Sequence, residues 1–231
     1  KGLDLPISGE PEQVVEEARL VRHVAVVASD FVGMKPRWEV QDGDVVKRGS
    51  LLFEDRRSPG VRFTAPASGR VSAIHRGAKR SLQSVVIELN DNELNGTLTV
   101  GDFERLEAFA GVPVAEMDAA GVRALLLESG LWTAFRTRPF EFVPAADASP
   151  SAIFVTAIDT EPLAADVEIA LQGRSADFED GLLALARLDA GAVYLCRKPG
   201  AEVGAGMAHG VSVQDFEGPH PAGLPGTHIH L

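Results

Sequence analysis

Cysteine is almost absent from this sequence: Cys196 is the single one among 231 residues. A lone cysteine excludes an internal disulfide and is typical of a protein that works in the reducing cytoplasm. Long apolar runs are also missing, since the longest of note are VAVVA and ALLL, whereas a membrane-spanning helix needs about 20 such residues. The opening stretch KGLDLPISGEPEQ lacks the apolar core of a secretory signal peptide. We therefore expect neither a membrane span nor a signal sequence.

Common catalytic motifs are missing as well. No Walker loop, G-x-G-x-x-G fingerprint or Ser-His-Asp order stands out. Positive charge is scarce, and the net charge of −11 argues against nucleic acid as a partner. The deficit is uneven, because residues 1–100 hold 14 Lys/Arg and 14 Asp/Glu while residues 101–231 hold 8 and 19. This asymmetry favours two domains with different neighbours, and 45% hydrophobic content is enough for two modest cores.

Short apolar segments separated by turn residues fill the first 100 positions. The β-branched segment 20–28 (LVRHVAVVA) is typical of a strand, and further strands are expected at 45–46, 51–53, 61–63, 70–74 and 84–89. Asp-Gly, Pro-Gly and single glycines lie between them. Many short strands with regular turns predict a small all-β barrel or sandwich, with the loop NDNELNGT near its end.

The pattern changes after residue 100. Asp118 is a candidate cap for a helix that ends at Gly130, and a second helix is expected over about 175–188. Continuous apolar strands at 152–158 and 192–196 flank that second helix. Strand, helix and strand in this order predict a βαβ unit with a parallel sheet. We therefore expect an α+β protein, with an all-β module over 1–100 and a Rossmann-like α/β module over 101–231.

Two stretches resemble the halves of a biotin- or lipoate-carrier domain, which is a barrel-sandwich hybrid. They are VQDGDVVKRGSLLFE (40–54) and FTAPASGRVSAIH (63–75). Carriers hold their cofactor on a lysine in the turn between the halves, but the turn here has Arg56 and Arg57 and no lysine. Arginine stays protonated and is a poor nucleophile, so we expect no covalent cofactor and a structural hairpin.

Several blocks together resemble a known family. They are KGLDLPISGEPEQ, the stretch from FVGMKPRWEV to AIHRGAKR, SGLWTAFRTRPF, AIDTEPLAAD and FEGPHPAGLPGTHIH. In these blocks the chain closely resembles the A-subunit family of the bacterial Na⁺-translocating NADH:quinone oxidoreductase. Members of that family continue past the last block, so we expect a fragment truncated at its C-terminus. The resemblance implies a peripheral subunit on the cytoplasmic face of the inner membrane. It also implies an enzyme complex with membrane-embedded partner subunits, ubiquinone as its substrate, and an isolated chain without activity.

The family is related to the flavin subunit of complex I and to a component of the Rnf electron-transport complex. In those relatives a glycine-rich loop after a helix holds the flavin phosphate on backbone N–H groups. The matching segment here is 129–140, and Gly130 is its only glycine. Trp132 and Phe135 bring bulky side chains to that loop, so we expect flavin mononucleotide not to bind.

The same segment supplies candidates for contact with the quinone. Trp132, Phe135 and Phe140, with Phe142, offer flat apolar surface, and Arg136 and Arg138 offer donors for a quinone carbonyl. A second surface, with Met34, Lys35, Arg37 and Trp38, suits an interface with another subunit. The competing interpretation is that the aromatic side chains form core and the arginines pair with acids of a partner.

Two further groups of residues carry weaker signals. The acidic loop 159–166 follows the carboxyl end of a strand, which is where open α/β sheets bind ligands. The loop is interpreted either as a ligand site or as a relic of one. His228 and His230 would share a face on a strand, but nearby residues do not complete a metal site, so we expect no metal. Two alternatives to quinone contact stay open: a purely structural docking role, and a flavin- and NADH-binding role of the complex I or Rnf type.

Overall fold

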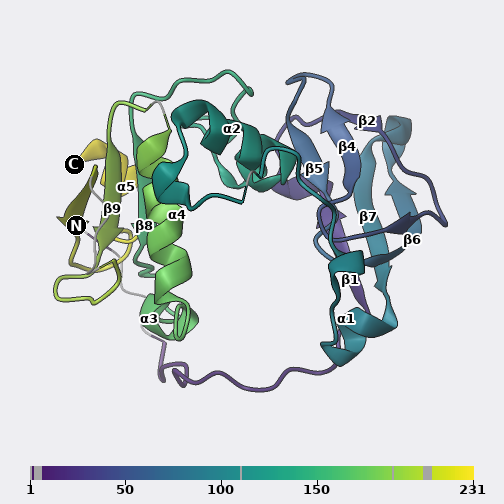
Figure 1. The fold of residues 1–231 in the computed structure, drawn as a ribbon. Helices are drawn as coiled ribbons and strands as arrows, with labels where there is room; N and C mark the ends of the chain where they lie inside the picture. The colour runs from purple at the N-terminus through teal and green to yellow at the C-terminus, as the bar shows by residue number, and fades with distance from the viewer. Residues whose placement is uncertain (1, 3–6, 110, 189, 205–209) are drawn as a thin grey trace. The chain divides into compact units, whose positions relative to one another are not determined.

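A computed structural model describes residues 2, 7–109, 111–188, 190–204 and 210–231 of the chain. Its contacts group the chain into two compact units, and neither unit is one continuous stretch. The barrel unit contains Ala18–Gly111 and Arg123–Ala148, and the α/β unit contains Lys1–Glu17, Val112–Val122 and Ser149–Leu231. Figure 1 shows the strands of the first and the helices and strands of the second.

Two antiparallel sheets build the barrel unit. The larger has the order β1-β7-β6-β3, with β1 at His23–Val27, β7 at Leu82–Leu89, β6 at Gly69–Arg76 and β3 at Val45–Val46. The smaller has the order β2-β4-β5, with β2 at Pro36–Trp38, β4 at Leu51–Asp55 and β5 at Arg62–Thr64. The unit also contains short helices, which are η1 (Ala28–Asp30), η2 (Ala78–Arg80), α1 (Asp91–Asn95), η3 (Val100–Asp102) and η5 (Leu131–Ala134). The predicted all-β module is confirmed.

The core of the barrel unit comes from alternating apolar residues of both sheets. Phe53 and Phe63 are stacked with ring centroids 4.6 Å apart, and both are almost fully buried. Gly69 begins β6 beside the backbone of β7, where an added Cβ would lie 2.0 Å from the carbonyl oxygen of Glu88. The sequence Ala-Ser-Gly before β6 therefore requires glycine at its last position for the two strands to pair.

A polar network surrounds Asp102 in the chain after β7. The buried carboxylate of Asp102 accepts hydrogen bonds from the side chains of Asn90 and Asn92 and from the backbone and hydroxyl of Thr99. The sequence NDNELNGT is thus a short helix, α1, with its preceding cap, and it anchors the chain after β7. These hydrogen bonds, led by the one from the backbone N–H of Thr99, hold the pKa of Asp102 far below its usual range.

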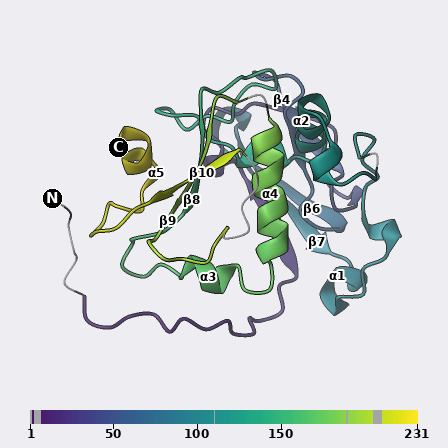
Figure 2. The same cartoon turned by 60° about the vertical axis from the view of Figure 1, so that its left-hand side comes forward.

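The α/β unit has a parallel sheet in the order β10-β9-β8, from Val211–Asp215, Val193–Arg197 and Ile153–Ala157. Helix α4 (Ser175–Arg187) lies in the connection from β8 to β9, and Figure 2 shows it beside the sheet. It packs on the core of this unit through Leu182. The remaining helices of this unit are η4 (Val114–Glu116), α3 (Val167–Ala170) and α5 (Pro225–His230). Helix α2 (Ala119–Glu128) belongs to this unit up to Val122 and to the barrel unit from Arg123 onward. The predicted βαβ unit and parallel sheet are confirmed.

Two segments differ from the sequence predictions: the expected loop NDNELNGT, which contains helix α1, and the stretch with His228 and His230. These two histidines were considered as a pair on a strand, but Pro225 at the first helical position starts α5 there. The single module boundary near residue 100 stays a prediction, whereas the compact units divide the chain differently. Residues 123–148 pack with the barrel strands, and residues up to 17 join the α/β unit, where the side chain of Gln13 bonds the backbone of Asp166.

Candidate functional site

The barrel unit contains a cleft of about 290 Å³, here called the Arg57 cleft. Its lining comes from three stretches of chain: Val32, Gly33 and Met34; Asp55, Arg57 and Ser58; and Thr137, Phe142, Val143, Pro144 and Ala145. The first follows η1, the second is the turn after β4, and the third follows η5. Its volume is near the lower limit of the roughly 300–1,000 Å³ found for small-molecule sites.

The end of helix α2 brings the third stretch to the barrel. Gly130 has a φ of 81°, and its N–H bonds the carbonyl of Leu127, which ends the helix as the sequence predicts. The hydroxyl of Thr64 on β5 donates to the carbonyl of Ser129 at 2.8 Å. An added Cβ at Gly130 would lie 2.4 Å from that hydroxyl oxygen. Glycine is required here by both the backbone angle and the close approach of β5.

The buried side chain of Trp132 holds the segment after Gly130 in place through its packing and one hydrogen bond. The indole is 3% exposed, and its N–H donates to the carbonyl of Pro144 at 3.0 Å. The guanidinium of Arg123 lies 5.0 Å from the indole centroid and bonds the carbonyls of Ala146 and Ala148. Phe135 packs edge-on against the indole at 5.1 Å. Trp132 is therefore a packed residue behind the cleft, and Phe135 supports it.

The other predicted quinone contacts have different positions. Arg136 donates to the carbonyls of Thr133, Phe135 and Asp30, so it connects this segment to η1. Arg138 forms an ion pair with Glu141. Phe140 is 68% exposed and stacks against Phe142, a lining residue, at 6.0 Å. The role of these residues in quinone binding stays a prediction.

The second predicted surface meets the cleft at one residue. Met34 lines the cleft, while the backbone N–H of Lys35 donates to the carboxylate of Asp55. Arg37 pairs with Glu54 at 2.8 Å on the neighbouring strand. Trp38 packs on Phe53 and under Arg76, with separations of 5.4 and 5.1 Å. Sequence reasoning placed Met34 and Phe142 on separate surfaces, and the fold brings both into one lining.

Sequence reasoning missed Gly33, Asp55 and Arg57 as site residues. The carboxylate of Asp55 accepts the backbone N–H groups of Lys35 and Arg57, both at 3.0 Å. Arg57 donates from Nη1 to the carbonyl of Gly33 at 2.9 Å, and its guanidinium lies 6.0 Å from the centroid of Phe142. The sequence feature that could have identified Arg57 as a site residue is the Arg56-Arg57 pair, in the turn where a carrier has its lysine.

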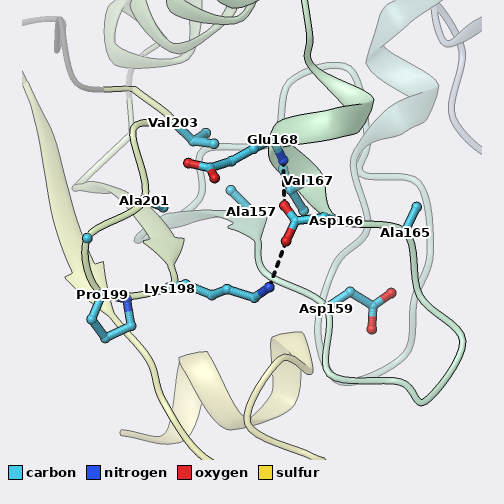
Figure 3. Close-up of a pocket in the computed structure, with 11 residues that line it drawn as sticks. Ala157, Asp159, Ala165, Asp166, Val167, Glu168, Lys198, Pro199, Ala201 and Val203 are labelled. Carbon is cyan, nitrogen blue, oxygen red and sulfur yellow. Dashed lines mark hydrogen bonds and ion pairs between the residues drawn. The ribbon is translucent and has the colours of Figure 1, made fainter. Parts of the chain in front are cut away.

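A second, smaller cavity of about 150 Å³ lies at the carboxyl ends of β8 and β9 (Figure 3). Asp159, Asp166, Glu168 and Lys198 line it. Asp166 accepts the N–H of Glu168 at 2.9 Å and pairs with Lys198 at 3.0 Å, and these two contacts lower its pKa. The acidic loop 159–166 therefore lies at the carboxyl ends of the strands, and its Asp166 is bonded to Glu168 and Lys198.

The histidines do not form the predicted shared face. His228 is buried on α5, where its Nε2 lies 2.9 Å from the carbonyl of Ala222 and its ring packs on Phe216. Within the described part of the chain, no group of three or more His, Cys, Asp or Glu is arranged to hold a metal ion. The helices described in the structure likewise include none with the length and apolar character needed to cross a bilayer.

The fold defines a barrel-sandwich hybrid whose attachment turn carries arginine, combined with a parallel α/β domain. Residues 1–90 match the model of the NqrA N-terminal barrel-sandwich hybrid domain, and residues 117–231 match the NqrA second alpha/beta domain. The chain therefore belongs to the NqrA family.

Curated relatives are named as the A-subunit of the Na(+)-translocating NADH-quinone reductase. The chain is 50% identical over all of its 231 residues to those of Pasteurella multocida (strain Pm70) and Shewanella amazonensis, covering 50% and 49% of their lengths. It is 48% identical to that of Neisseria meningitidis serogroup B over the same residues, again covering 50% of the relative. The chain thus spans about half the length of the relatives it matches.

Proposed function

We propose that this chain provides the first two domains of the NqrA subunit in a Na⁺-translocating NADH:quinone reductase. In this proposal it is a peripheral subunit on the cytoplasmic face of the membrane, bound to membrane-embedded partners. Its Arg57 cleft receives the ring of the quinone substrate, and the chain carries no covalent cofactor. The observation that carries the proposal is the cleft itself, where residues from both predicted surfaces meet.

The composition of the lining supports a quinone ring. Val32, Met34, Phe142, Val143, Pro144 and Ala145 provide apolar walls. Asp55, Arg57, Ser58 and Thr137 provide polar groups beside them. A cavity that combines apolar walls with hydrogen-bond donors suits a flat ring that has two carbonyl oxygens and is otherwise apolar. Phe142 is 38% exposed, so part of its side chain is accessible to such a ligand.

Segment 129–140 offers little support for binding a flavin phosphate. A phosphate site needs several backbone N–H groups that point at the ligand. Here the N–H of Thr133 bonds the carbonyl of Gly130 at 3.1 Å, and that of Phe135 bonds the carbonyl of Trp132 at 3.2 Å. The buried indole of Trp132 fills the space beside them. We therefore propose that this chain transfers no electrons itself and positions the quinone for other subunits.

Photolabelling of the assembled reductase tests the proposal. An azido-substituted ubiquinone is cross-linked, and the labelled peptides are mapped on this chain. We expect label in 32–34 or 137–145, displaced by excess ubiquinone. Phe142→Ala should reduce the yield several-fold, whereas Val100→Ala, at a residue that is 93% exposed and outside the lining, should not. Label confined to other parts of the chain, or equal yields in both variants, would contradict the assignment.

A docking role without quinone contact is the second candidate, and exposed apolar residues favour it. Leu131 and Phe140 are 61% and 68% exposed at the two ends of the same segment. Exposed apolar side chains that gather on one surface mark contacts with other proteins, and Phe140 stacks on Phe142 there. Under this alternative, Phe140→Ser weakens retention of the chain during purification of the complex, and no ubiquinone-displaceable label appears in the cleft.

A further inference from the structure

The turn after β4 is the position of the cofactor lysine in carrier domains, and here it forms one wall of the cleft. Two contacts fix it to the loop after η1. The backbone N–H of Arg56 donates to the carbonyl of Lys35 at 2.8 Å, and the carboxylate of Asp55 accepts the N–H of Lys35. Within the turn, the same carboxylate also accepts the N–H of Arg57. Asp55 is 8% exposed. The turn is therefore held to the loop by a part-buried hydrogen bond on the buried Asp55 and by one backbone hydrogen bond, and it differs from a freely mobile attachment tip.

Arg57 occupies a defined position within this wall. Its Nη1 bonds the carbonyl of Gly33, and the guanidinium lies over Phe142. An added Cβ on Gly33 would lie 2.6 Å from Nη1, so glycine leaves room for the guanidinium. A guanidinium has five N–H donors, and the structure describes one of them in use. The remaining donors lie on a side chain that lines the cleft.

We propose that Arg57 determines the specificity of the cleft by donating a hydrogen bond to a carbonyl oxygen of the quinone ring. This inference rests on the proposed function and adds the residue that recognises the ring. Arginine suits the role because its planar cation stays charged and packs on an aromatic face, while its other N–H groups remain available. The bond to Gly33 and the contact with Phe142 hold the donor in place before the ligand arrives.

The test uses the assembled reductase and compares Arg57→Gln with Arg56→Gln. Both variants remove one positive charge from the same turn, but Arg56 does not line the cleft. A charge-assisted hydrogen bond predicts that Arg57→Gln raises KM for ubiquinone-1 about 10- to 100-fold, with a smaller change in kcat. Arg56→Gln should leave KM within about twofold. Gly33→Ala, which displaces the guanidinium, should move KM in the same direction as Arg57→Gln.

A competitor without carbonyl groups separates recognition from a purely structural role. The dimethyl ether of the reduced quinone keeps the ring shape and replaces both carbonyl oxygens by ether oxygens, which are weaker acceptors. The wild-type enzyme should prefer the quinone over this ether by at least about tenfold, and Arg57→Gln should lose most of the preference. A structural role alone weakens both ligands equally and leaves the preference unchanged, which would overturn the proposal.

The labelling experiment distinguishes failure of this inference from failure of the proposed function. If wild-type label maps to the cleft and Arg57→Gln changes neither KM nor the preference, Arg57 is not the recognising donor and the site stands. If wild-type label maps elsewhere, the site itself is wrong and the inference falls with it.

Discussion

Trp132 offers the sharpest test of the packing behind the cleft, through the substitution Trp132→Phe. The indole is 3% exposed, so the smaller ring leaves the apolar contacts largely in place and removes the N–H that bonds Pro144. Loss of this part-buried hydrogen bond costs about 0.5–1.5 kcal/mol. Weakening the contact with the Arg123 guanidinium adds about 0.5–1 kcal/mol. We therefore expect the barrel unit to lose about 1–2.5 kcal/mol of unfolding free energy.

Urea unfolding followed by fluorescence measures this loss directly. The chain has two tryptophans, and both belong to the barrel unit, so Trp38 reports on that unit in the variant. Phe140→Leu, at a residue that is 68% exposed, is the control and should change the unfolding free energy by less than about 0.5 kcal/mol. If Trp132→Phe is as mild as this control, the indole is not part of the packed structure. A direct quinone contact by its ring would then become the better interpretation.

Three further predictions concern titratable groups. Burial raises the pKa of Cys196 to about 11, so iodoacetamide at pH 8 should modify it only after the α/β unit unfolds, and rapid labelling of the native chain would contradict its burial. Burial lowers the pKa of His228 below its unfolded value of about 6.5, so the unfolded state binds more protons there. The α/β unit should therefore lose stability as pH falls through that value. Urea midpoints at pH 7.5 and 5.5 measure this loss of stability, and His228→Gln should reduce it. The depressed pKa of Asp102 means that its contribution is complete above the unfolded value of about 3.9 and is lost as pH falls below it. Asp102→Asn should lower the urea midpoint of the barrel unit at pH 7 and flatten its decline at acid pH, and a midpoint equal to wild type would contradict the network.

The sequence was most informative where local physics decides the structure. The helix over 175–188 and the parallel strands around it were predictable because their apolar residues follow the helical and strand periods. The stop at Gly130 was predictable because a left-handed residue ends a helix. Helix α5 was missed because His228 and His230 have the spacing of a strand face, whereas Pro225 favours a helix start.

The candidate site was only partly predictable, for a different reason. Trp132 and Arg136 looked like ligand contacts because large aromatic and cationic side chains are common in binding sites. Their observed partners are backbone carbonyls of Pro144 and Asp30, and a carbonyl partner leaves no signature in sequence. Arg57 meets Phe142 across 85 positions of chain, so no spacing rule connects them.

The replacement of lysine by arginine in the carrier turn also suggests how the cleft operates. A carrier needs a long, mobile arm, since its cofactor travels between distant sites. Here Arg57 is held by Gly33 and Phe142, and the turn is held by Asp55, so this wall is suited to a ligand that arrives by itself. A donor fixed in advance lowers the ordering cost of binding, and this saving is largest for a small ring with few contacts. The same fixation explains why Gly33 matters: a side chain there would displace the guanidinium and restore the mobility that the bond to its carbonyl removes.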